Sequence, residues 1–141
     1  MKNGADAEGI DDAGNYDITM ACMRTLGFTD EEIDHIWEIL AAILSLGNVE
    51  YKFDEDKNEV SIEEHLHDSV RRAAELIKLS EPEKMFTMLQ KKVVKYPGQV
   101  IETPFSLVEA ISARNSCAKT IYSKLFDWIV ARINSTIDSR M

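Results

Sequence analysis

The fold of this chain is decided by its last stretch, "SLVEAISARNSCAKTIYSKLFDWIVARINSTIDSRM", residues 106–141. Apolar residues recur along it every three or four positions, which is the period of a helix with an apolar face. The pattern predicts a single helix over residues 107–137, weakest at residues 114–116. At about 1.5 Å per residue this helix is on the order of 45 Å long, whereas a domain of this size has a radius of gyration of about 14 Å. The helix therefore crosses the whole body or protrudes from it, and we interpret the chain as part of something larger.

The starts of four helices are marked by one repeated spacing. A Ser or Thr is followed three positions later by Glu, so that each side chain can satisfy a backbone N–H in the first turn of a helix. The four pairs are Thr29 with Glu32, Ser61 with Glu64, Ser80 with Glu83, and Ser106 with Glu109. Because each pair precedes apolar residues at helical spacing, the sequence predicts that all four act as capping boxes.

Five helices are expected in all. The first covers residues 16–26 and stops at Gly27. The second follows Thr29, carries Leu44 on its apolar face and ends where Gly47 supplies a left-handed cap. This second helix has the widest apolar face, so it should be the most buried. The third carries apolar residues from 62 to 77. The fourth is short and has Pro82 in its first turn, where a missing N–H costs nothing.

Two hairpins interrupt the helices. The runs "VEYKF" and "NEVSI", residues 49–53 and 58–62, alternate in polarity around the charged turn "DEDKN". A second pair of β-favouring runs flanks the sequence Tyr-Pro-Gly-Gln at residues 96–99. Proline followed by glycine is typical of a type II turn, because Pro97 fixes the first φ and Gly98 accepts a positive one. Residues 92–103 are therefore predicted to form a projecting hairpin or loop.

The composition is that of a folded, acidic chain. Hydrophobic residues make up 45% of it, enough for a core, and the net charge is −9. That charge argues against bulk attraction to nucleic acid or to an anionic membrane. Residues 1–15 are small, acidic and polar, and predict a flexible lead-in rather than a signal peptide. Cys22 and Cys117 have no metal-binding spacing and suit a reducing cytoplasm.

No catalytic motif is present in these 141 residues. The sequence has no phosphate-binding GxxxxGKS or GxxxxGKT loop, no GxGxxG and no HExxH. His65 and His67 lie two residues apart on an expected helix, so their side chains point to different sides and predict no metal site. Composition and spacing alone therefore indicate a mostly helical domain without a visible active site, metal site or cofactor site.

One basic cluster stands out in the acidic chain. Lys91, Lys92 and Lys95 lie within five residues on the expected hairpin. One interpretation is a solubilising edge strand, since lysine is a common device against edge-to-edge pairing. The other is a local positive surface that meets an acidic partner. The pattern by itself leaves both open.

Two long motifs resemble the myosin motor domain. They are "LGFTDEEIDHIWEILAAILSLGNVEYK", residues 26–52, and "ARNSCAKTIYSKLFDWIVARIN", residues 113–134; "GIDDAGNY", residues 9–16, is similar to the loop that precedes them. The resemblance runs in order over residues 9–137. It implies a mainly α fold with short β-hairpins, in which residues 16–141 form part of a motor domain of the P-loop NTPase type that ends in a long helix.

The resemblance also implies a role. It places the chain in the actin-facing upper 50-kDa subdomain, after the phosphate loop and switch I and before the strand that carries switch II. The nucleotide site would then lie outside the chain, so this segment alone would not hydrolyse ATP, while the whole motor would be an actin-activated ATPase that uses MgATP. The implied partners are the actin filament and the remainder of the motor, and the implied location is cytoplasmic and cytoskeleton-associated.

The lysine-bearing hairpin falls on the family's cardiomyopathy loop, which contacts actin. The resemblance therefore implies actin-binding roles for Lys91, Lys92, Lys95 and Gln99. Gln99 occupies a position that is acidic or phosphorylatable in many myosins, and glutamine offers neither a charge nor a phosphate acceptor. Asn115 replaces an aspartate of the family motif and removes an ion-pair partner. These departures suggest an unconventional myosin.

The long helix carries a further expectation. Without the rest of a motor, part of its apolar stripe would be exposed, and we expect self-association or marginal stability of the isolated chain. The alternative function is a free-standing, non-catalytic helical interaction module derived from a myosin, with no ATPase.

Overall fold

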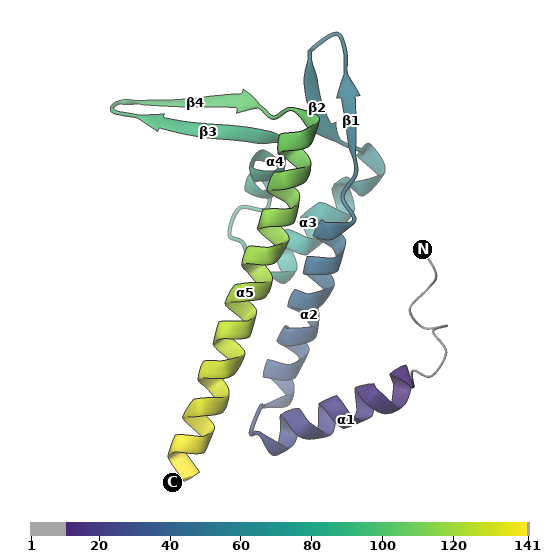
Figure 1. Ribbon diagram of the computed structural model, residues 1–141, viewed down its shortest axis with the longest axis vertical. Coiled ribbons are helices and arrows are strands. Elements are labelled where there is room, and N and C mark those ends of the chain that lie inside the picture. The colour runs from purple at the N-terminus through teal and green to yellow at the C-terminus, as the bar shows by residue number, and fades with distance from the viewer. Residues whose placement is uncertain (1–10, 141) are drawn as a thin grey trace.

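The computed structural model describes residues 11–140 as a mostly helical protein with two small antiparallel hairpins (Figure 1). Most of the expected lead-in, residues 1–15, lies outside the described residues. Helix α1, Asp12–Thr25, begins four residues before its predicted start, because Asp11 caps it by accepting a hydrogen bond from the Gly14 N–H at 3.0 Å. Gly27 follows with a φ of 92°, which confirms it as the stop.

Helix α2, Asp30–Gly47, starts with the predicted capping box. The Thr29 hydroxyl accepts from the Glu32 N–H at 3.1 Å, and the Glu32 carboxylate accepts from the Thr29 N–H at 3.0 Å. This helix has more buried residues than any other described helix. Two details were predicted wrongly: Gly47 remains helical and Asn48 is the C-cap, while Leu44 is 69% exposed.

The first hairpin pairs β1, Tyr51–Asp54, with β2, Glu59–Ile62. A 3₁₀ turn, Glu64–Leu66, then leads into α3, His67–Leu76. The Ser61–Glu64 capping box is wrong, because Ser61 lies in β2 opposite Lys52 and has no helix to cap. The alternating strand pattern of this segment outweighs the local capping signal.

Helix α4, Glu83–Gln90, is short and follows Pro82, which is its N-cap residue. No side chain caps this helix, so the Ser80–Glu83 box is also wrong. Strands β3, Lys91–Tyr96, and β4, Gln99–Pro104, form the second hairpin. Its turn contains Gly98 at a φ of 76°, as the Pro-Gly sequence predicts.

Helix α5, Leu107–Arg140, has 34 residues and runs beside α2, as Figure 1 shows. Its predicted capping box is confirmed by the Ser106 hydroxyl, which accepts from the Glu109 N–H at 3.2 Å. Two groups of buried side chains lie along it. One joins the end of α2 to α3, α4 and β2, and the other joins the start of α2 to Leu125. None of the helices within residues 11–140 combines the length and apolar character that crossing a bilayer requires.

Candidate functional site

The β3–β4 hairpin projects from the body and is nearly all exposed (Figure 1). Its strands pair in regular antiparallel register from Lys91 opposite Pro104 to Tyr96 opposite Gln99. Only Val94 is partly buried along the two strands. The hairpin therefore contributes almost nothing to the core, and its side chains are available to a partner on both faces.

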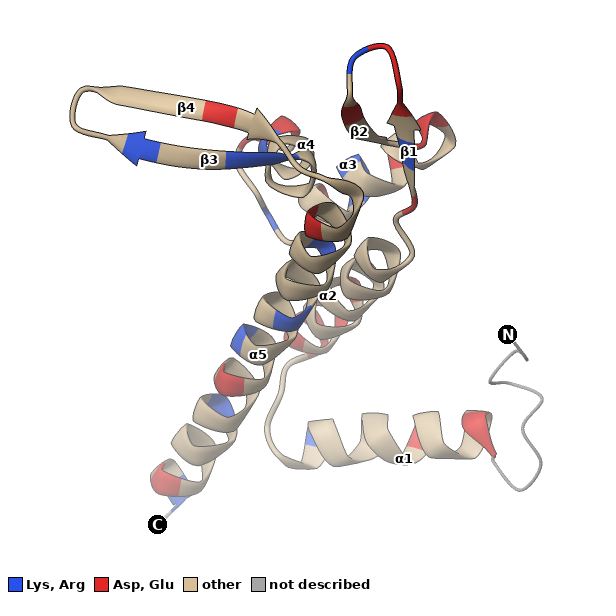
Figure 2. Ribbon diagram, turned by 45° about the horizontal axis from the view of Figure 1, so that its top comes forward, with Lys and Arg blue, Asp and Glu red and all other residues tan. Residues whose placement is uncertain are grey.

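The structure places the three predicted lysines on one strand but not on one face. Successive side chains of a strand point to opposite faces, so Lys91 and Lys95 share one face and Lys92 lies on the other. Glu102 is on the face of Lys91, and the Lys91 Nζ lies 3.6 Å from its carboxylate. Three lysines and one glutamate give β3–β4 a net charge of +2 (Figure 2).

Gln99, the fourth predicted site residue, opens β4 at the tip of the hairpin, opposite Tyr96. It shares the face of Lys92 rather than that of Lys91 and Lys95. Apolar side chains accompany the charges: Tyr96 is 55% exposed and Val100 is 61% exposed. The tip thus combines uncharged polar, aromatic and aliphatic groups, with the positive charge behind it on β3.

The base of the hairpin is fixed by backbone and side-chain hydrogen bonds. The Phe105 N–H donates to the Gln90 carbonyl at 3.1 Å, which joins the two ends of the hairpin. The Gln90 side-chain oxygen accepts from the Ile62 N–H at 2.8 Å, which ties α4 to the first hairpin. The direction in which β3–β4 projects is therefore set by the helical body.

A tyrosine that sequence reasoning missed lies at the centre of this base. The Tyr51 hydroxyl lies 2.9 Å from the Leu89 carbonyl and 3.1 Å from the Ala110 carbonyl, so it joins β1 to α4 and α5. Burial raises the pKa of Tyr51 to about 12, outweighing the opposing effect of Arg114. No motif marks Tyr51, because its role depends on three elements that meet only in the folded chain.

Arg114 forms a second link at the same base. Its Nη1 donates to the Val49 carbonyl at 2.8 Å, while Nε and Nη2 donate to the Asn115 side-chain oxygen at 3.2 and 3.1 Å. The stretch where the apolar stripe weakens is thus where α5 makes a polar contact with the segment that connects α2 to β1. Asn115, which departs from the family motif, accepts hydrogen bonds from its neighbouring arginine.

The far half of α5 is held by a separate cluster. The Arg132 Nε donates to the Glu32 carboxylate at 2.9 Å, and its Nη2 donates to the Gly27 carbonyl at 2.8 Å. Hydrogen bonding to Arg132, together with the Thr29 N–H, lowers the pKa of Glu32. Helix α5 is therefore attached to the body both beside the hairpin and at the corner between α1 and α2.

Apolar side chains remain exposed on α5, as the sequence predicts. Of its 34 residues only Ala110 and Leu125 are buried. Among the exposed ones, Tyr122 and Phe126 are each 55% exposed and Val108 is 77% exposed. A helix that is apolar on several sides is typical of one buried within a larger protein. Within residues 11–140, no three His, Cys, Asp or Glu side chains gather as metal ligands.

Comparison with known proteins agrees with these features. The family model described as the myosin head, or motor domain, matches residues 1–141. The chain is 34% identical to Myosin-1 of Aspergillus fumigatus over 137 residues, which is 96% of this chain and 11% of that protein. It is 35% identical to unconventional myosin ID of Drosophila melanogaster over 128 residues, or 91% of this chain and 12% of that protein.

The chain therefore belongs to the myosin motor-domain family. Its relatives include fungal myosin-1 proteins and an unconventional myosin, and it spans 11% and 12% of the length of the two compared above. The mainly helical fold with two small hairpins and a long last helix is the architecture that the resemblance implied.

Proposed function

We propose that this chain is the segment of an actin-based, ATP-driven myosin motor that supplies an actin-facing hairpin and a long coupling helix. Membership of the motor-domain family supports the motor role. The observation that carries the finer proposal is the projecting β3–β4 hairpin, which has a charge of +2 on a chain of net charge −9.

The charge of the hairpin suits an acidic filament such as actin. Lys91, Lys92 and Lys95 are exposed on an element that extends beyond the body, so a filament can approach them without contacting the acidic remainder. Exposed charges mainly accelerate encounter and make binding sensitive to salt, rather than adding large affinity. Tyr96 and Gln99 at the tip would make the short-range contacts that follow.

The long helix suits the transmission of force. Its first turns join the base of the hairpin through Tyr51 and Arg114, and its far half is fixed to the corner before α2 by Arg132. A load on the hairpin is therefore passed to a continuous helix of 34 residues. In this proposal α5 couples the actin contact to the nucleotide site of the motor.

Hydrolysis belongs to the whole motor in this proposal. The family's phosphate-binding and magnesium-binding residues would lie outside this chain, and MgATP would be bound by the remainder of the motor domain. The partners are then the actin filament and that remainder, and the location is cytoskeletal. We expect no regulation by a phosphate at Gln99, because an amide does not accept a phosphoryl group.

The test is charge reversal of Lys91, Lys92 and Lys95 to glutamate in the intact motor, followed by actin co-sedimentation at several salt concentrations. We expect affinity to fall at least tenfold at low salt, or about 1.4 kcal/mol, and to depend less on salt. The matched control reverses three exposed lysines elsewhere: Lys57, Lys78 and Lys119. Unchanged affinity at low salt, or an equal loss in the control, contradicts the role of the hairpin.

A further inference from the structure

Thr103, near the base of the β3–β4 hairpin, is a threonine followed directly by a proline. Its side chain is exposed, and it lies with Pro104 in the extended strand β4. The chain has three prolines, and the residues that precede them are Glu81, Tyr96 and Thr103. Thr103 is therefore the single serine or threonine of these 141 residues that stands before a proline.

The conformation of this segment suits an enzyme that binds extended peptides. A residue before proline is restricted to extended backbone, and Thr103 already has that conformation in β4. All six residues of β4 are exposed, and within residues 11–140 only one edge of the strand is paired, because the sheet has two strands. The free edge can be bound through main-chain hydrogen bonds. Pro104 has no N–H, so it fits an active site without an acceptor for one, which is the property that proline-directed kinases select.

The charges around Thr103 favour a phosphate there. Lys92 is directly opposite Thr103 in the register, so the two side chains share a face, with Cβ atoms about 5 Å apart. Lys92 forms no salt bridge within residues 11–140, whereas Lys91 on the other face lies 3.6 Å from the carboxylate of Glu102. Because Glu102 is on that other face, the face of Thr103 has no acidic side chain of the hairpin. A phosphate on Thr103 would therefore meet the Lys92 ammonium group rather than a like charge.

A phosphate would also remove the positive charge of the hairpin. At pH 7 a phosphothreonine carries a charge of about −1.5 to −2. Strands β3 and β4 have three lysines and one glutamate, so their net charge of +2 would fall to about zero (Figure 2). The hairpin would then lose the charge that sets it apart from the acidic remainder of the chain.

We propose that Thr103 is phosphorylated by a proline-directed kinase, and that the phosphate pairs with Lys92 and weakens the attraction of the hairpin for an acidic filament. The Thr103 hydroxyl oxygen attacks the γ-phosphorus of MgATP, the bond from that phosphorus to the bridging oxygen breaks, ADP leaves, and the hydroxyl proton passes to a base of the kinase. This site is separate from the position that is acidic or phosphorylatable in many myosins, since Gln99 occupies that position at the hairpin tip. The effect on actin rests on the proposed function, whereas the site and its pairing do not.

The first test treats the full-length protein with a purified mitogen-activated protein kinase and MgATP and maps phosphate by mass spectrometry of its peptides. We expect phosphate on Thr103, and we expect Pro104→Ala to slow its addition at least tenfold. Pro97→Ala removes the other proline of the same hairpin and should not slow it. Full-length protein left unmodified at Thr103 by a kinase that is active on a Thr-Pro peptide overturns the proposal, as does an unchanged rate in Pro104→Ala.

The second test measures the pairing with Lys92 in the absence of actin. A phosphate held by an ammonium group is a poorer substrate for a phosphatase, so Lys92→Gln in the phosphorylated full-length protein should accelerate loss of the Thr103 phosphate about threefold. Lys95→Gln makes the same charge change on the same strand but on the opposite face, and should have no effect. Equal rates in the two variants overturn the pairing.

Actin co-sedimentation at low salt tests the effect on binding. Phosphorylated full-length protein should bind actin about threefold more weakly than unphosphorylated protein, and kinase-treated Thr103→Ala should show no loss. If the phosphate changes nothing although reversal of the three hairpin lysines weakens binding, the regulatory effect is overturned. If lysine reversal also changes nothing, the proposed actin contact fails and this effect fails with it, while the phosphorylation and pairing results stand on their own.

Discussion

At the scale of single residues, the Tyr51 side chain connects β1 to both α4 and α5. Its hydroxyl lies within hydrogen-bonding distance of two carbonyls on different helices, both at the base of the projecting hairpin. A hydroxyl has a single proton, so it is shared between these two acceptors or alternates between them. Removing it leaves both carbonyls without this partner in a half-buried site.

We predict that Tyr51→Phe lowers the free energy of unfolding of the chain by about 1–2 kcal/mol, which is the usual effect of deleting a partly buried hydrogen-bonding group. Urea unfolding at pH 7 measures it. Tyr122→Phe removes a hydroxyl from a side chain that is 55% exposed, and serves as the control with an expected change near zero. Equal effects of the two substitutions would show that the Tyr51 hydroxyl is not a structural link.

The same tyrosine gives the chain a pH dependence. Its pKa is raised from 10.0 to about 12 in the folded state, so folding favours the protonated form. The stability it contributes is present below pH 10 and is lost as the pH rises from 10 towards 12, because only the unfolded state deprotonates over that window. The stability of Tyr51→Phe should therefore fall less than that of the unchanged chain over this window.

At the scale of elements, two of the four capping-box spacings form capping boxes and two do not. The capping boxes at Thr29 and Ser106 form because each lies in a connection just before a helix. Ser61 has the same spacing but belongs to a strand that pairs with β1, and the pairing decides its conformation. The α4 helix starts without a side-chain cap, directly after Pro82.

The hairpin turn offers a test at this scale. Gly98 has a φ of 76°, and a Cβ built there would meet no atom within 4 Å, so the cost of Gly98→Ala is purely conformational. We expect about 1 kcal/mol, seen as roughly fivefold faster hydrogen exchange of the β3 and β4 amides. Gly47→Ala changes a helical glycine with equally open surroundings and should leave hairpin exchange unchanged. Unaltered exchange in Gly98→Ala would contradict the positive φ of this turn.

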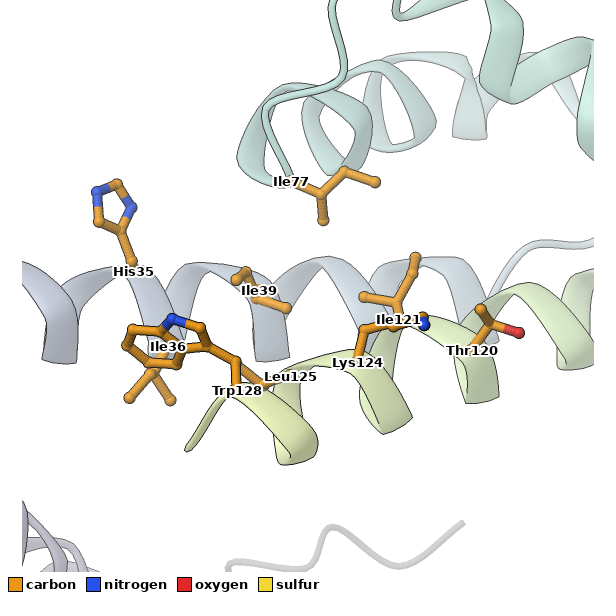
Figure 3. Close-up of a pocket in the computed structure, with 9 residues that line it drawn as sticks. All are labelled: His35, Ile36, Ile39, Ile77, Thr120, Ile121, Lys124, Leu125 and Trp128. Carbon is orange, nitrogen blue, oxygen red and sulfur yellow. The ribbon is translucent and has the colours of Figure 1, made fainter. Parts of the chain in front are cut away.

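At the scale of the whole molecule, the chain has more apolar surface than it covers itself. Helix α5 packs against α2 along one side and borders an open apolar cavity of about 420 Å³ on a second (Figure 3). On a third side it exposes Tyr122, Phe126 and Val130. This arrangement agrees with a segment built to lie inside a larger motor. A free-standing interaction module would need a partner to cover the same surfaces.

We predict that the isolated 141-residue chain self-associates through the exposed apolar residues Tyr122, Phe126 and Val130 of α5. Sedimentation at tens of micromolar should give a mass well above 16.0 kDa. The double substitution Phe126→Gln with Val130→Gln keeps the net charge and should shift the chain towards monomer. Tyr96→Gln with Val100→Gln, on the hairpin, is the control and should leave the mass unchanged. A monomeric unsubstituted chain would show that these residues drive no association.

The sequence by itself determined the mainly helical class, the two hairpins and the family, although it placed Ile62 on the third helix, whereas Ile62 ends β2 and α3 begins at His67. Periodicity, capping residues and the Pro-Gly turn act within a few residues of one another, so they can be read along the chain. The sequence also predicted the lysines of the second hairpin and the exposed apolar residues of α5. Errors arose where a longer-range pairing overrode a local signal, as at Ser61, or where packing left a residue outside, as at Leu44.

Only the tertiary structure decided which distant residues meet. The links from Tyr51 to α4 and α5 and from Arg132 to Glu32 join positions separated by tens of residues. No local spacing encodes such contacts, because they depend on how helices cross after their apolar faces are buried. The division of the lysines between two faces likewise became clear only once the register of β3 and β4 was known.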